Sequence, residues 1–71
     1  MSKFLVIVEE TETGYSAYVP DLPGCVATGK TKTQIEHVMS EAIEFHLEGL
    51  REDDEPFPVA HAYSTYCEVP A

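Results

Sequence analysis

The sequence predicts a small α+β domain with the element order β-β-β-α-β, in which one helix covers one face of a four-stranded sheet. Three observations favour this fold class. Short runs of β-branched and aromatic residues fill the first 29 positions, a stretch with helical spacing follows, and one more strand-like run lies near the end. A chain of 71 residues has room for one core, so we expect residues 1–71 to form a single domain.

The first three predicted strands form an antiparallel meander. Residues 3–10 (KFLVIVEE) and 15–19 (YSAYV) are joined by TETG, which ends in a glycine as hairpin loops often do. The second run ends at Pro20, and residues 25–29 (CVATG) form a third, shorter strand. The sequence therefore predicts three consecutive strands that pair with their neighbours along the chain.

The stretch PDLPGCVATGKT (20–31) predicts a turn. Proline and glycine occupy the two central positions of LPGC (22–25), where proline fixes φ and glycine tolerates a positive φ. Asp21 can hydrogen-bond the backbone of this turn. A phosphate-binding loop would need more glycines and a lysine at the start of a helix, so GKT (29–31) does not indicate one.

A helix is predicted from Thr31 to about Asp53. Its two candidate capping boxes are TKTQ (31–34) and TQIE (33–36), and either threonine could be the N-cap. The acidic run EDDEP and the following prolines end it. The apolar residues that carry its helical spacing are Ile35, Val38, Met39, Ala42, Ile43, Leu47 and Leu50.

The last predicted strand is residues 61–69 (HAYSTYCEV). If the helix makes a right-handed crossover, this strand lies parallel to residues 3–10 at their free side. The sheet order would then be 3-2-1-4, with residues 3–10 in a central strand whose two apolar faces both need burial. One helix covers one face only, so the other face favours self-association into a homo-oligomer.

The two cysteines are predicted to be buried small hydrophobic residues. In the expected sheet, Cys25 and Cys67 lie on opposite edge strands, three spacings of roughly 4.8 Å apart. A disulfide needs Cα atoms within about 7 Å, so we expect none.

The composition limits the function classes. A net charge of −9, from 13 acidic and 4 basic residues, opposes contact with nucleic acid and favours a basic partner. We expect no signal peptide and no membrane span, and therefore a cytoplasmic protein.

Two stretches carry a resemblance to a known family. PDLPGCVATGKT (20–31) and EAIEFHLEGLREDDEPFP (41–58) resemble the HicB antitoxins of HicA–HicB toxin–antitoxin systems. The resemblance implies a HicB-like, partial ribonuclease-H-like fold and a partner, HicA, a basic ribonuclease that degrades mRNA and is blocked by HicB. Typical HicB antitoxins continue into a DNA-binding segment, whereas this sequence ends at EVPA, so we expect a short form that does not bind its promoter.

We expect no catalysis, metal or cofactor. A two-metal nuclease needs a carboxylate in the middle of its central strand, and FLVIV has none. His37, His46 and His61 lack the spacing of a zinc site. His46 falls on the apolar side of the predicted helix, where it is either a half-buried structural residue or a functional, pH-sensitive one.

The predicted partner-binding residues form an acidic row on the helix side opposite the core. Within it, residues 44, 48 and 52 repel one another at i, i+4 spacing, and no lysine or arginine is interleaved on that ridge to relieve them. We therefore expect a protein-binding domain that neutralises a HicA-like toxin by masking its RNA-binding surface. The alternatives are a homo-oligomeric structural domain without a toxin and, more weakly, a small nuclease. The candidate contact residues are Glu41, Glu44, Glu48, Glu52, Asp53 and Asp54.

Overall fold

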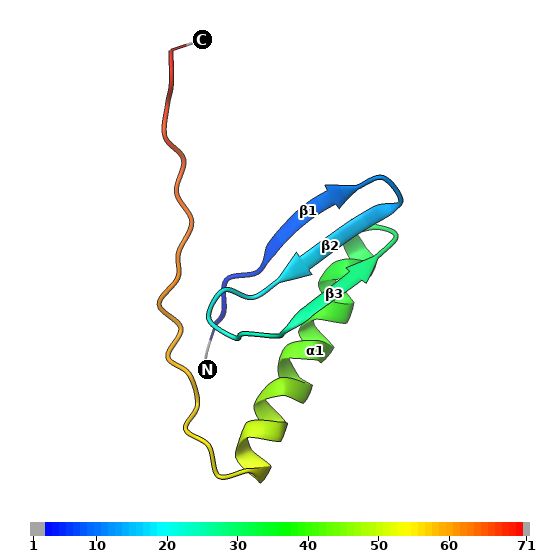
Figure 1. Cartoon of the computed structure of the whole chain (residues 1–71). Coiled ribbons are helices and arrows are strands. Elements are labelled where there is room, and N and C mark those ends of the chain that lie inside the picture. The colour runs from blue at the N-terminus through cyan, green and yellow to red at the C-terminus, as the bar shows by residue number, and fades with distance from the viewer. Residues whose placement is uncertain (1–2, 71) are drawn as a thin grey trace.

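Three strands form one sheet, and Figure 1 shows a long helix across one face of this sheet and an extended segment that leads toward the C-terminus. This computed structural model describes residues 3–70. The α+β class and the order of the first four elements agree with the prediction. The bounds are Ile7–Thr11 for β1, Gly14–Tyr18 for β2, Val26–Gly29 for β3 and Lys32–Glu52 for α1.

The sheet is antiparallel, with the order β1-β2-β3. Val8 lies opposite Ala17, and Ala17 lies opposite Ala27. β2 is therefore the central strand and β1 lies at an edge. The prediction that residues 3–10 form a central strand is wrong, because the strand expected on their free side does not form in the structure.

The turn at residues 22–25 is confirmed. The Cys25 N–H donates to the Leu22 carbonyl at 3.0 Å, and Gly24 has a φ of +85°. That left-handed conformation is the one for which glycine was expected. The role predicted for Asp21 is different: its carboxylate accepts hydrogen bonds from a segment 40 residues away, as shown below.

Thr31 is the residue that caps α1. Its hydroxyl accepts from the Gln34 N–H at 3.0 Å, and the Gln34 side chain accepts from the Lys30 N–H. The first bond satisfies a donor that the first turn of a helix leaves without a partner, and the second ties the Gln34 side chain to the residue before the cap. The first of the two candidate capping boxes is therefore the one used.

The C-terminal end of α1 is a Schellman motif. The Glu55 N–H donates to the Leu50 carbonyl at 2.9 Å, and the Asp54 N–H donates to the Arg51 carbonyl at 3.2 Å. Asp54 has a φ of +57°, a conformation that glycine usually adopts at this position. In this chain an aspartate, Asp54, adopts this left-handed conformation at the helix C-terminus.

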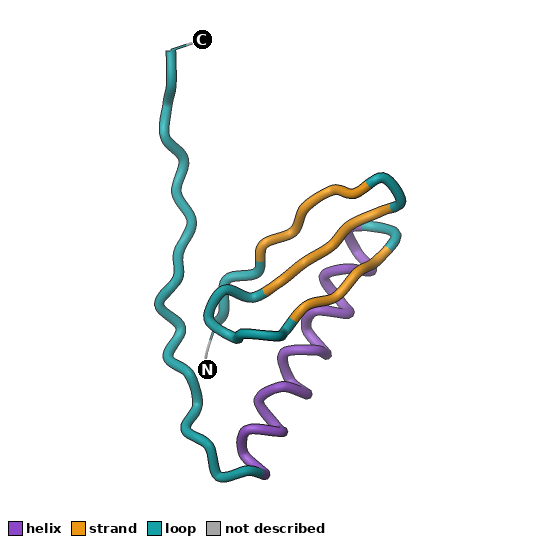
Figure 2. Tube along the Cα trace, viewed as in Figure 1, coloured by secondary structure: helices purple, strands orange, loops and turns teal. Residues whose placement is uncertain are grey.

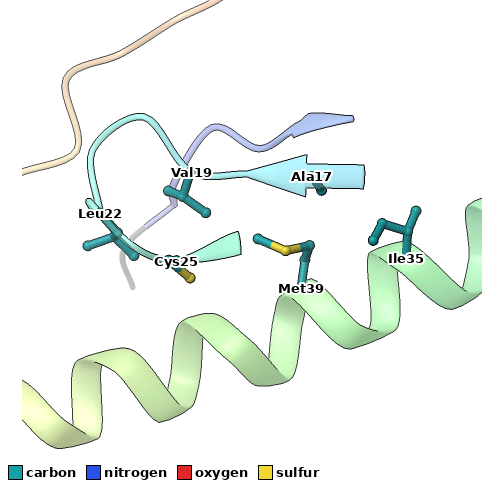
Figure 3. Packing of buried hydrophobic residues seen from close by; sticks show 6 residues of the cluster. All are labelled: Ala17, Val19, Leu22, Cys25, Ile35 and Met39. Atoms are coloured by element: carbon teal, nitrogen blue, oxygen red, sulfur yellow. The ribbon is translucent and has the colours of Figure 1, made fainter. Parts of the chain in front are cut away.

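The core lies between α1 and the sheet and is small (Figure 3). α1 supplies Ile35 and Met39, which point toward β2 and the turn that follows it. The helix covers the sheet face that carries Phe4 and Val6. From residue 40 to residue 70, no side chain that the structure describes is buried. The six buried residues are Ala17, Val19, Leu22, Cys25, Ile35 and Met39.

Residues 56–70, which we call the arm, form neither helix nor strand (Figure 2). The prediction of a strand at 61–69 is therefore wrong for this structure, and the sheet order 3-2-1-4 is not formed. The physical reason is that a strand exists only when a neighbour supplies its hydrogen bonds, and the arm makes none with β1. Cys67 is exposed rather than buried, whereas Cys25 is buried as expected.

Asp21 holds the arm to the rest of the molecule. One oxygen of its carboxylate accepts from the N–H groups of His61 and Ala62, each at 3.0 Å, and the other lies 3.1 Å from His61 Nδ1. The Asp21 side chain is only 4% exposed. The pKa of this carboxyl is lowered chiefly by the Ala62 hydrogen bond, against an opposing effect of desolvation.

Candidate partner-binding surface

The six acidic residues predicted to bind a partner are all exposed along α1 and its C-terminal end. The four glutamates fall within about 80° of the helix circumference, at 100° per residue. We call this set the acidic ridge: Glu41, Glu44, Glu48, Glu52, Asp53 and Asp54.

The acidic ridge does not stabilise the helix that carries it. Acidic side chains are favourable near a helix N-terminus and unfavourable near the C-terminus, by about 0.3–1 kcal/mol each at exposed sites. The first turn of α1 holds no acidic residue, and the acidic residues gather toward its C-terminal end. The fold therefore gives no reason for this placement, and a basic partner would give one.

A histidine and an arginine lie beside the ridge. His37 Nε2 lies 3.6 Å from Glu41 Oε1, with both side chains well exposed. Arg51 shares a hollow with Glu44 and Glu48. The Arg51 guanidinium instead lies over the Phe57 ring, 5.6 Å from its centroid, and forms no ion pair with a ridge carboxylate among residues 3–70.

Phe45 lies beside the ridge and is 78% exposed. On the helix circumference it falls next to Glu41 and Glu52, away from the side that packs on the sheet. The charge pattern alone did not indicate this residue, although the same angular projection places an aromatic side chain among the carboxylates. Exposed aromatic residues of this kind often anchor protein–protein interfaces.

A groove of about 790 Å³ runs along the other side of Phe45. α1 contributes Val38, Ala42 and His46 to its lining, and Val26 of the edge strand β3 contributes to it as well. His46 is half-buried there, which is compatible with a structural role and with a functional one. The groove thus leaves room for a side chain beside Phe45.

Among the described residues 3–70, no three His, Cys, Asp or Glu side chains converge as a metal site would require. Burial raises the pKa of the Cys25 thiol, which disfavours the reactive thiolate.

Over the described residues, α1 is the only helix, and it is not apolar enough to cross a bilayer.

Comparison with known proteins identifies the family to which this chain is similar. The family model described as HicB-like antitoxin of bacterial toxin–antitoxin system matches residues 4–71. A UPF0150 protein of Thermoplasma acidophilum is 40% identical over 57 residues, which is 79% of this chain and 83% of that protein. A UPF0150 protein of Helicobacter pylori is 41% identical over 72% of this chain and 71% of its own length.

A longer relative comes from Haemophilus phage HP1. This uncharacterized 14.9 kDa protein of the rep-hol intergenic region is 38% identical over 65 residues, or 92% of the chain. The match spans 49% of the phage protein, so the chain corresponds to about half the length of that relative.

Proposed function

The chain belongs to the family of HicB-like antitoxins of bacterial toxin–antitoxin systems, and from this premise we propose that it binds and neutralises a HicA-like toxin without catalysis of its own. The observation that carries the proposal is the acidic ridge with Phe45 beside it. A toxin that degrades mRNA needs a basic surface for its substrate, and a row of carboxylates is complementary to such a surface.

The proposed complex forms in two parts. The acidic ridge attracts the cations of the toxin's RNA-binding surface, which accelerates encounter and weakens as salt rises. Phe45 and the adjoining groove then provide apolar contact, which slows dissociation. With the basic surface covered, mRNA cannot bind.

The test is a charge reversal at Glu44 and Glu48, compared with a matched reversal at Glu9 and Glu10. Both pairs are exposed, and each double lysine variant changes the net charge from −9 to −5, because every reversal adds two charges. Long-range attraction due to net charge therefore changes equally in both variants. Only a local contact distinguishes them.

We expect Glu44→Lys/Glu48→Lys to slow association with the HicA-like toxin by roughly ten-fold or more in low salt. Glu9→Lys/Glu10→Lys should change the rate much less, and the far-ultraviolet circular dichroism of both variants should match the native chain. Stopped-flow association at several salt concentrations provides the measurement. Equal slowing by both variants would assign the effect to net charge and place the interface elsewhere.

A further inference from the structure

The outer edge of β1 and the helix next to it form an incomplete layer. No strand among residues 3–70 pairs with this edge. Beside it lies an open hollow of about 360 Å³ between β1 and α1, lined by the apolar residues Val6, Val8, Met39 and Ile43 together with Glu36 and Ser40. Val8 is 41% exposed, although its side chain faces the helix-covered side of the sheet. An added strand at this edge would bury these apolar side chains.

The arm has the composition of such a strand. From residue 63 to 69, alternate positions hold Tyr63, Thr65, Cys67 and Val69, whereas the positions between them hold Ser64, Tyr66 and Glu68. Successive side chains of a strand point to opposite faces. The first set, at positions 63, 65, 67 and 69, is the less polar one and fits the hollow. The second set includes Glu68, the only charged residue of the seven, and suits the face toward solvent.

The arm does not reach the β1 edge of its own molecule. Asp21 fixes it at His61 and Ala62, and from there it runs away from the sheet (Figure 1). Tyr63 is 83% exposed, Tyr66 is 100% exposed and Val69 is 76% exposed. The radius of gyration is 14.0 Å, whereas a compact domain of this length has about 11 Å. The arm is thus presented outward, beyond the body that it belongs to.

We propose that residues 63–69 of one copy pair as a fourth strand with the outer edge of β1 in a second copy, which donates its own arm in return. Exchange of an identical element is a route to a closed two-fold dimer. It supplies the hydrogen bonds that both β1 and the arm lack, and it fills both hollows. It also protects two exposed strand edges from uncontrolled pairing. This proposal does not depend on the existence of a toxin.

The native Cys67 allows a direct test by disulfide trapping. Cys67 is exposed and belongs to the set that faces the hollow. Chains with native Cys67 are mixed with longer, tagged chains that carry Val8→Cys together with Cys67→Ser. Cross-strand neighbours on one face have Cβ atoms about 5 Å apart, which suits a disulfide. Cys25 is 4% exposed in both chains and stays out of the reaction.

The matched control replaces Val8→Cys with Glu9→Cys, the adjacent position on the opposite face of β1. We expect the mixed disulfide with Val8→Cys to exceed that with Glu9→Cys by ten-fold or more under mild oxidation. Equal amounts would overturn the proposed pairing. A single chain that carries both Val8→Cys and native Cys67 tests the alternative. A disulfide that forms within this chain, and none between chains, would mean that the arm pairs only with its own β1 and would overturn the proposal.

An independent measurement uses the full chain without cysteine chemistry. Light scattering of the native protein should give twice its 7.9 kDa mass at high micromolar concentration. Thr65→Asp, which puts a charge into the hollow, should raise the dimer dissociation constant at least ten-fold. Ser64→Asp places the same charge on the outward face and should change it less than three-fold. A native chain of monomeric mass, or equal effects of the two variants, would overturn the proposal.

Discussion

The two halves of α1 differ in their surroundings. Its first turns carry Ile35 and Met39, which are completely or almost completely buried against the sheet. Its last turns still pack Ile43 and Leu47 partly on the core, and they also carry Phe45 and the acidic ridge in solvent. One regular helix is thus fully packed at one end and mostly exposed at the other, which leaves the exposed end free for the proposed recognition.

The largest expected effect concerns the packed half. Ile35→Ala removes most of a fully buried side chain, and we expect it to lower the free energy of unfolding by about 2–5 kcal/mol. Phe45→Ala, in the exposed half, should change it by less than about 0.5 kcal/mol. Urea titration followed by circular dichroism measures both. Similar losses in the two variants would contradict the division of the helix.

The same exposed phenylalanine should matter for binding. In the proposed complex, Phe45→Ala should raise the dissociation rate from the HicA-like toxin about ten-fold, which corresponds to about 1.4 kcal/mol. Surface plasmon resonance with immobilised toxin measures this rate. Val59→Ala is the control, because Val59 is 77% exposed on the arm and outside the ridge. An unchanged rate for Phe45→Ala would remove this residue from the interface.

A smaller effect is expected at the helix end. Asp54→Gly relieves a positive φ in a residue with a Cβ atom and removes a negative charge from a helix C-terminus. We expect it to raise stability by about 0.5–1 kcal/mol, or Tm by a few degrees. Asp53→Gly changes the same charge at a φ of −87° and should not stabilise the protein. Thermal unfolding of the two variants separates backbone strain from charge.

The smallest effect concerns attachment of the arm, which depends on pH. The folded pKa of Asp21 lies below its ordinary value of 3.8, so the stabilisation is complete above that value and is lost as pH falls through the folded pKa. We expect the His61 and Ala62 amide resonances to shift in this acidic range, and Asp21→Asn to abolish the transition. NMR titration detects it. A transition at the ordinary pKa would indicate that these hydrogen bonds are not formed.

The sequence predicted the features that depend on local chemistry. The positive φ of Gly24, the cap at Thr31 and the end of α1 follow from residues a few positions apart. The fourth strand could not be predicted in the same way, because strand formation depends on a distant partner. Asp21 is a similar case, since its hydrogen-bond donors lie 40 and 41 residues further along the chain.

For the candidate site, the charge pattern predicted the ridge, but the contacts around it needed the structure. Spacing placed the glutamates on one side of α1, and they are exposed there. It did not place Arg51 over Phe57, because that contact depends on the direction in which the chain leaves the helix. Phe45 is a different case, because it does not follow the apolar spacing from which the core side of α1 was predicted.

The strand order β1-β2-β3 has a consequence for folding kinetics. Each strand pairs with the next one along the chain, so the sheet forms from hairpins. α1 packs on β2 as well as on β3, so the core also needs contacts between residues that are distant in sequence. Mixed domains of this kind fold at rates between those of helical bundles and those of all-β sandwiches. The last residue of the buried cluster is Met39, so the ridge and the arm add no buried side chain to the core whose assembly sets that rate.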